Sequence, residues 1–265
     1  MAKLKKFIIA PMRHGNAPTE GTVRPSTLDV ARARRMIRRM KPGEKIGIET
    51  FKNLLEGRES PEDLKVNRLY QLAREARQKG LDVVPLDDEI LADIQFVAKY
   101  GANRLRENQE KDLKLISAGI RINNVINAIR SAIFMHKMQT HETANNIMGL
   151  AHAGHLVEVH PAAVRVKRDF LPRKISMRQN QTMMRQSFAP QDFERIRQII
   201  SKPEQAIGLR RRIAEEIIGM DFESLGTEER IRRIKESIFG KQLGKPRLKA
   251  DQKINEIVFG RKHQA

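Results

Sequence analysis

The chain has 265 residues, of which 40% are hydrophobic, so it is long enough for one large domain, or for a domain of about 150 residues with a smaller appendage. Its formal net charge of +19 favours association with polyanions such as RNA, DNA or anionic membrane surfaces. The absence of cysteine excludes disulfides, thiol catalysis, zinc ribbons and iron–sulfur clusters, so any metal ion would have to be bound by His, Asp and Glu.

The first predicted element is a short buried strand over residues 4–11, where an apolar run follows a basic start. This apolar run is too short for the core of a signal peptide. No stretch of the chain approaches the roughly 18 consecutive apolar residues of a membrane span. We therefore expect a cytoplasmic protein without a membrane span.

A helix is expected after a polar loop. Its cap lies in the Pro-Ser-Thr segment 25–27, and it ends in the Lys-Pro-Gly segment 41–43. Between these segments apolar residues recur at helical spacing, and arginines occupy the other side. Residues 45–50, with the sequence KIGIET, then predict the second strand.

The next helix has a recognisable beginning and end. Ser60 is a typical N-cap residue that is followed by Pro61 and two acids, and Gly80 is a typical C-terminal glycine. Residues 81–86 predict the third strand.

From residue 88 to about residue 141 the pattern is helical, and we expect breaks near Gly101 and Gly119. Residues 146–151 predict the fourth strand. Strands that alternate with helices of this length favour parallel strands joined by right-handed crossovers. The strands are apolar throughout, as expected for strands buried on both faces of a sheet.

We therefore predict an α/β domain, a mostly parallel sheet with flanking helices, over residues 1–160. Residues 161–265 are predicted to form a basic, mainly helical region. Its helices are expected near 191–200, 206–218, 227–238 and 251–259.

Ionisable residues follow all four predicted strands. In an open parallel sheet, ligands bind outside the carboxyl ends of the strands. The residues at these ends are Arg13 and His14, Glu49, Asp87 and Asp88, and His152 and His155. Two histidines with carboxylates are suitable ligands for a divalent metal ion. The same residues could instead provide the acid and the base of a hydrolysis.

Each of these residues also has a structural interpretation. His14 could stabilise a loop, and Glu49 could form a salt bridge with Arg13 or Arg121. One of the two aspartates after the third strand is expected to be the N-cap of the following helix. The two later histidines lie in a segment rich in Gly and Ala, which predicts a turn with close backbone approach to a ligand or to a neighbouring helix.

Five short motifs occur in the same order as in a known family. They are Pro11-Met12-Arg13-His14, KPGEKIGIE at 41–49, KGLDVVPLD at 79–87, Arg121-Ile122-Asn123, and Gly149-Leu150-Ala151-His152. Over residues 5–160 the chain thereby resembles the TraB/PrgY group of the erythromycin esterase, ChaN and Tiki-like superfamily. The first motif differs from the family's G-T-x-H because Pro11 replaces the glycine.

The resemblance implies an α/β fold with two similar halves and a metal-dependent hydrolase site for a peptide or ester bond. It implies His14 and His152 as metal ligands, Glu49 as a third ligand or general base, and Arg121 as the group that stabilises negative charge. His155, as a further ligand, and Asp88, as a further catalytic residue, are secondary candidates. The identity of the divalent metal ion stays open.

Two other functions are compatible with the sequence. Arg13-His14-Gly15 after the first strand is similar to the motif of histidine phosphatases, in which the histidine accepts a phosphoryl group. Alternatively, the α/β domain is a scaffold, and the basic region binds RNA or a ribosome through phosphates. Its basic helices could also contact acidic surfaces in a homo-oligomer. The candidate nucleic-acid-binding residues are Arg165, Lys167, Arg168, Arg173, Lys174, Arg178, Arg185, Arg210, Arg211 and Arg212.

Overall fold

The computed structural model describes residues 6–12, 27–55, 68–107, 113–166, 190–218, 225–239 and 249–260. The chain forms two compact units, each built from two stretches of sequence. The first unit contains Met1–Asp87 and Ile133–Thr182, and the second contains Asp88–Ala132 and Met183–Ala265. The predicted domain boundary near residue 160 stays a prediction, because a compact group of contacts is not the same as a domain that folds by itself.

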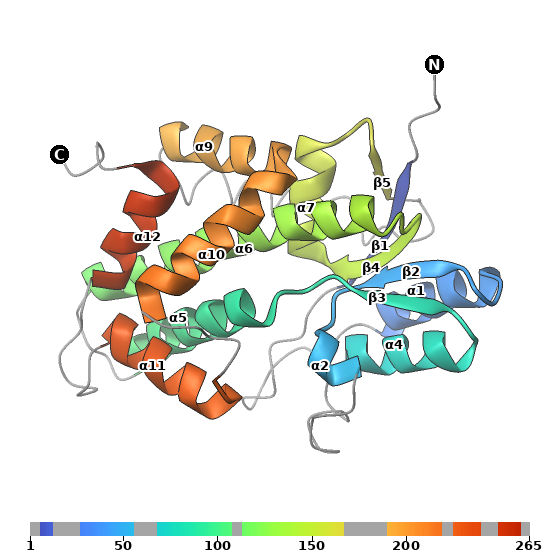
Figure 1. The fold of residues 1–265 in the computed structure, drawn as a ribbon, viewed down its shortest axis with the longest axis horizontal. Helices are drawn as coiled ribbons and strands as arrows, with labels where there is room; N and C mark the ends of the chain where they lie inside the picture. Colours follow the sequence, from blue (N-terminus) through green and yellow to red (C-terminus); the bar gives the residue numbers. More distant parts are fainter. Residues whose placement is uncertain are drawn as a thin grey trace. The chain divides into compact units, whose positions relative to one another are not determined.

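The first unit contains a parallel sheet of five strands, in the order β3-β2-β4-β1-β5 (Figure 1). This confirms the predicted α/β class with a mostly parallel sheet. The strands are β1 (Phe7–Met12), β2 (Lys45–Ile48), β3 (Asp82–Pro85), β4 (Asn145–Gly149) and β5 (Val164–Val166). The strand β5 was not predicted from the sequence, because three residues with an arginine in the middle give no apolar run.

The helices of the first unit lie on both faces of this sheet. They are α1 (Thr27–Arg39), α2 (Lys52–Leu55), α4 (Arg68–Gln78) and α7 (Leu150–Val159). From β1 to β2 and from β2 to β3 the chain moves toward the edge of the sheet formed by β3. From β3 to β4 and from β4 to β5 it moves back toward the edge formed by β5. Because such crossovers are right-handed, α1 and α4 cover one face and α7 covers the other (Figure 1).

The core between the sheet and the α1–α4 pair follows from helical periodicity. Buried residues of α1 recur at positions 30, 33, 36 and 37, and Met40 directly after the helix continues the series. Those of α4 recur at positions 69, 72, 73 and 76. Both sets have the spacing that places side chains on one side of a helix. They pack against Ile46, Ile48 and Ile147 of the sheet. Gly80, two residues after the end of α4, has a φ of 81°, as expected for a C-terminal glycine.

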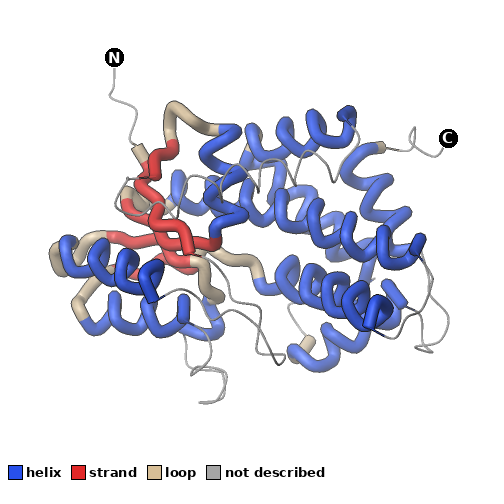
Figure 2. Tube along the Cα trace, turned by 180° about the vertical axis from the view of Figure 1, so that it is seen from behind, coloured by secondary structure: helices blue, strands red, loops and turns tan. Residues whose placement is uncertain are grey.

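The second unit is helical. It contains α5 (Glu89–Glu107), α9 (Pro190–Ser201), α10 (Pro203–Ile218), α11 (Thr227–Phe239) and α12 (Lys249–Phe259). The helices α9 to α12 confirm the four helices that were predicted in the C-terminal region. Figure 2 shows the helices in blue and the strands in red. In the parts of the chain that the structure describes, no helix combines the length and apolarity needed to cross a bilayer.

The helix α6 (Leu113–Thr140) runs from the second unit into the first. The predicted breaks at Gly101 and Gly119 are wrong, because Gly101 lies inside α5 and Gly119 lies inside α6. A glycine inside a helix costs only about 1 kcal/mol relative to alanine, which the packing of a long buried helix can offset.

Candidate functional site

The candidate site lies at the carboxyl ends of β2 and β4. Glu49 follows β2 directly, and its backbone amide donates a hydrogen bond to the carbonyl oxygen of Ile147 in β4 at 2.9 Å. The sheet pairing therefore continues to Glu49 and fixes the position of its backbone. The side chain is buried, with an exposed fraction of 6%.

Both carboxylate oxygens of Glu49 face residues that follow β4. Oε2 accepts a hydrogen bond from the backbone amide of Gly149, and Oε1 lies 3.5 Å from Nε2 of His152. Gly149 is the N-cap residue of α7, where no side chain of α7 itself forms a capping hydrogen bond and the first turn has no acid. Glu49 thus supplies, from another strand, the negative charge that the amino end of a helix favours.

His152 is held in place by packing as well as by Glu49. It has an exposed fraction of 3%, and its ring lies 4.4 Å from the ring of Phe134 in α6, at an interplanar angle of 37°. This contact restricts the rotation of the imidazole. The result is a buried carboxylate–imidazole pair with a defined geometry.

The position of the pair in the sheet is typical of ligand sites. The chain leaves β2 toward the face covered by α1 and α4, whereas it leaves β4 toward the face covered by α7 (Figure 1). Neighbouring strands whose connections go to opposite faces leave a crevice at their carboxyl ends, where α/β proteins bind ligands. Glu49 and His152 lie at such a point.

The structure places the two histidines after β4 in a helix, so the predicted turn is wrong. His155 is buried in α7, and burial lowers its pKa to about 4. In the described residues, no group of three or more His, Asp and Glu side chains is arranged to hold a metal ion. The role of His155 as a further metal ligand stays a prediction. Residues 13–15, on which the metal-site prediction and the phosphatase alternative both depend, lie outside the described residues.

The two aspartates after β3 have different roles. The backbone of Asp87 is held beside the candidate site. Its amide donates to the carbonyl of Thr50 at 3.2 Å, and its carbonyl accepts from Lys137 Nζ at 2.7 Å. Asp88 is the N-cap of α5, since its Oδ1 accepts from the amide of Leu91 at 3.0 Å. Its other oxygen, Oδ2, lies 3.1 Å from Nε of Arg210. This confirms that one of the two aspartates is an N-cap.

Arg121 lies in α6 within the second unit, where its guanidinium is 5.4 Å from the ring centroid of Phe259. The salt bridge between Arg121 and Glu49, one structural interpretation of that carboxylate, stays a prediction. The catalytic role of Arg121 stays a prediction.

Three features of the site were not found by sequence reasoning. They are the Gly149 amide, the ring of Phe134, and the hydroxyl of Thr50, which is buried next to Glu49 and has no hydrogen-bond partner in the described part of the chain. A buried polar atom without a partner is uncommon and often marks a bound water or ligand. Thr50 could have been predicted as part of the site only because it directly follows Glu49 in the sequence.

The candidate nucleic-acid-binding residues are described only in part. Arg165 in β5 is exposed, as are Arg211 and Arg212 in α10, whereas Arg210 forms the ion pair with Asp88. Residues 167–189, which contain the other six candidates, lie outside the described residues. Binding of RNA or a ribosome by this region stays a prediction.

Comparisons with known proteins add no relative to this description. No family model, curated protein or solved structure matches the chain.

Proposed function

We propose that this chain is a metal-dependent hydrolase of the TraB/Tiki-like type that acts on a peptide or ester bond. The observation that carries the proposal is the buried pair of Glu49 and His152 at the carboxyl ends of adjacent strands. A carboxylate and an imidazole that are removed from water, with the carboxylate held by a backbone hydrogen bond and the imidazole by ring packing, are typical of catalytic and metal sites. The order of the five sequence motifs is a second, independent support.

The geometry of the pair fits two ligands of one metal ion. The separation of 3.5 Å between Glu49 Oε1 and His152 Nε2 is longer than a charge-assisted hydrogen bond of about 2.8 Å. Two ligand atoms at about 2.1 Å from a tetrahedral ion would be roughly 3.4 Å apart. Glu49 and His152 would thus hold the ion with His14, the third histidine of the family motif. A bound divalent ion would supply Lewis acidity toward the scissile carbonyl.

The protein groups have separable tasks in this proposal. The hydrogen bond from Gly149 fixes Oε2 of Glu49 and leaves Oε1 for chemistry. Oε1 would either bind the ion or, where other residues bind the ion, accept a proton from an attacking water. Phe134 and the surrounding helices exclude bulk water from His152 and keep its Nε2 directed at the carboxylate. Burial strengthens each of these electrostatic interactions.

The first test is thermal unfolding of chelator-treated protein with and without manganese, cobalt, zinc or calcium. An ion at about one hundred times its dissociation constant would stabilise the native state by about 2.7 kcal/mol, which is a shift of a few degrees at this size. We expect the shift in the wild type and its loss in Glu49→Gln and His152→Asn. The control is His141→Ala, at an exposed position after α6, which should keep the full shift.

The second test measures hydrolysis of a panel of ester and peptide substrates by the metal-loaded protein. Glu49→Gln keeps an oxygen that can accept the Gly149 hydrogen bond, so the variant should fold while its kcat falls at least about a hundredfold. A metal shift of equal size in the wild type and in both site variants would reject the ligand assignment. Equal activity of Glu49→Gln and the wild type would reject the assignment of the base.

A further inference from the structure

The positive charge of the described chain is concentrated in two segments of the first unit. Residues 27–45 and 68–79 contain α1, α4 and the turns that follow them. Together they hold eleven Lys and Arg against three Asp and Glu, so these 31 residues carry +8 of the net +19. In the described residues, the excess of positive charge is therefore concentrated on and next to the helices α1 and α4.

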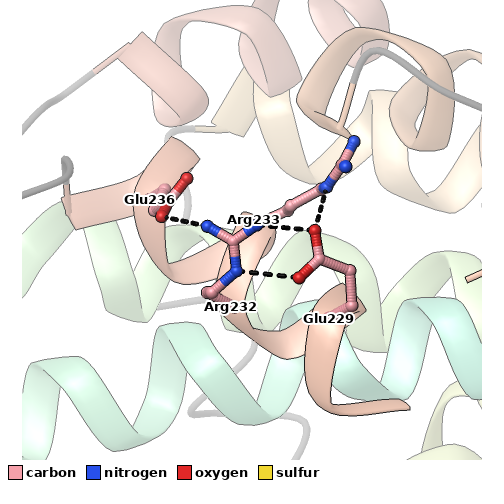
Figure 3. A network of polar contacts seen from close by, with 4 residues as sticks. All are labelled: Glu229, Arg232, Arg233 and Glu236. Carbon is pink, nitrogen blue, oxygen red and sulfur yellow. Dashed lines mark hydrogen bonds and ion pairs between the residues drawn. The ribbon is translucent and has the colours of Figure 1, made fainter. Parts of the chain in front are cut away.

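The described C-terminal helices differ sharply from this pair. Residues 190–218, 225–239 and 249–260 hold twelve Lys and Arg against ten Asp and Glu. Many of these cations are neutralised within the second unit. In α11, for example, Arg232 and Arg233 both bind Glu229, and Arg232 also binds Glu236 (Figure 3).

Hydrogen bonds between α1 and α4 show that the two helices form one surface. Arg34 donates from Nε and Nη2 to the carboxylate of Glu75 at 2.8 and 2.5 Å, which joins the two helices. Lys79 Nζ donates to the carbonyl of Ile37 at 2.7 Å, close to the end of α1. Because both helices bury their apolar sides against the sheet, their remaining sides face outward together (Figure 1).

The outward sides are rich in exposed cations. Arg35 and Arg38 are three residues apart on α1, and Arg74 and Arg77 are three residues apart on α4, which is the spacing of neighbours on a helix surface. Within the described residues, Arg35, Arg38 and Arg74 have no acidic partner. We define the α1–α4 basic face by six exposed residues: Arg35, Arg38, Arg39, Lys41, Arg74 and Arg77.

We propose that the α1–α4 basic face binds the phosphodiester backbone of a nucleic acid. Eight of the eleven cations in the two segments are arginines, whose guanidinium groups match phosphate oxygens in bidentate geometry. A membrane-binding helix would also expose large apolar side chains. In the described residues the exposed large hydrophobic side chains are Phe96 and Ile207, which lie outside both helices. None of the six residues of the face is aromatic, and Tyr70, the aromatic residue of α4, is partly buried, so the proposed contact is to phosphates and independent of sequence.

The test compares two variants of the full chain that lose the same number of charges. The first carries Arg35→Gln, Arg38→Gln and Arg74→Gln. The matched control carries Arg197→Gln, Lys235→Gln and Lys253→Gln, all at exposed positions of the C-terminal helices and none of them a candidate nucleic-acid-binding residue. Fluorescence anisotropy with labelled 20-mers of double-stranded RNA, single-stranded RNA and double-stranded DNA gives the Kd from 50 to 300 mM salt, and circular dichroism verifies folding.

We expect the wild type to bind with a steep salt dependence. Each phosphate contact contributes about 0.9 to the slope of log K against log salt on a duplex, so the first variant should lower the slope by about 2 to 3 and weaken binding at least about tenfold. The control should stay within about twofold of the wild type. Equal losses in both variants would show a general effect of net charge and overturn the proposal. Binding to phosphatidylserine vesicles without binding to any of the three nucleic acids would also overturn it.

Discussion

Two buried threonines of the first unit differ in the surroundings of their hydroxyl groups. Thr143 Oγ1 donates to Asn146 Oδ1 at 2.7 Å, whereas Thr50 Oγ1 has no hydrogen-bond partner among the described residues. Both side chains are almost fully buried. Substitutions at the two positions can therefore distinguish the stabilisation by a buried hydrogen bond from the destabilisation by a buried hydroxyl that has no partner.

We predict opposite effects of Thr→Val at these two positions. Thr50→Val should raise the free energy of unfolding by about 1 kcal/mol, because it removes a polar atom that loses water on folding without a replacement. Thr143→Val should lower it by about 1 to 3 kcal/mol, because Asn146 Oδ1 loses its donor. Urea denaturation measures both. A loss of stability in Thr50→Val would instead indicate that its hydroxyl binds a water or ligand.

His155 predicts a pH dependence of stability. Burial lowers its pKa from 6.5 to about 4, so between these values the unfolded chain binds a proton that the folded chain does not. Stability should therefore fall as the pH falls from about 6.5 to about 4, by at most about 3 kcal/mol from this residue. His155→Gln should flatten the profile in this window, measured by urea denaturation at a series of pH values. Parallel profiles for wild type and variant would contradict the prediction.

At the scale of elements, α11 contains two arginines with contrasting ion pairs. Arg230 contacts Glu89 at 2.9 Å and Asp93 at 3.3 Å, and its side chain is 7% exposed. Arg232 makes shorter contacts, at 2.6 Å to both Glu229 and Glu236, but its side chain is 56% exposed (Figure 3). Burial, and not the length of the contact, should decide how much each arginine contributes to stability.

We predict that Arg230→Gln lowers the free energy of unfolding by about 3 kcal/mol, since it leaves two carboxylates of α5 in a poorly solvated place without their counter-ion. Arg232→Gln should cost less than about 1 kcal/mol, because water and salt screen an exposed pair. Chemical denaturation of both variants provides the measurement. Similar costs for the two would show that solvent exposure is the wrong criterion here.

The helix α7 shows why one element was assigned incorrectly from sequence. The segment Gly149–Gly154 is rich in small residues and has no capping side chain of its own, so it predicts a turn. The cap is the carboxylate of Glu49, which is one hundred residues earlier in the chain. Because periodicity and caps are read within a short window, a helix whose cap comes from another strand gives no local signal.

At the scale of the whole molecule, the distribution of charge has a consequence for stability. A segment pair with a net charge of +8 repels itself in the folded state, and salt screens this repulsion. We predict that the variant with Arg35→Gln, Arg38→Gln and Arg74→Gln has a Tm about 1 to 3 °C above the wild type at 20 mM salt, and that the difference shrinks at 300 mM.

The control for this effect is the variant with Arg197→Gln, Lys235→Gln and Lys253→Gln. Its charges come from helices in which acids and bases nearly balance, so its Tm at low salt should stay within about 1 °C of the wild type. An equal rise in both variants would show that the net charge of the chain matters and its location does not.

The sequence by itself determined the elements with strong local signals. Four apolar runs predicted β1 to β4, and the apolar spacing of the C-terminal segments predicted α9 to α12. The alternation of strands and helices predicted a parallel sheet, because a crossover of that length joins parallel strands. It also placed Glu49 and His152 at the same edge, since the carboxyl ends of parallel strands meet there.

Only the tertiary structure decided the order of the strands, and with it the partners of each residue. Placing β4 next to β2 brings the amide of Gly149 and the imidazole of His152 to the carboxylate of Glu49. The tertiary structure also places Arg121 in the second unit, with its guanidinium over the ring of Phe259. Strand order depends on contacts between segments a hundred residues apart, whose closure entropy and packing no local pattern encodes.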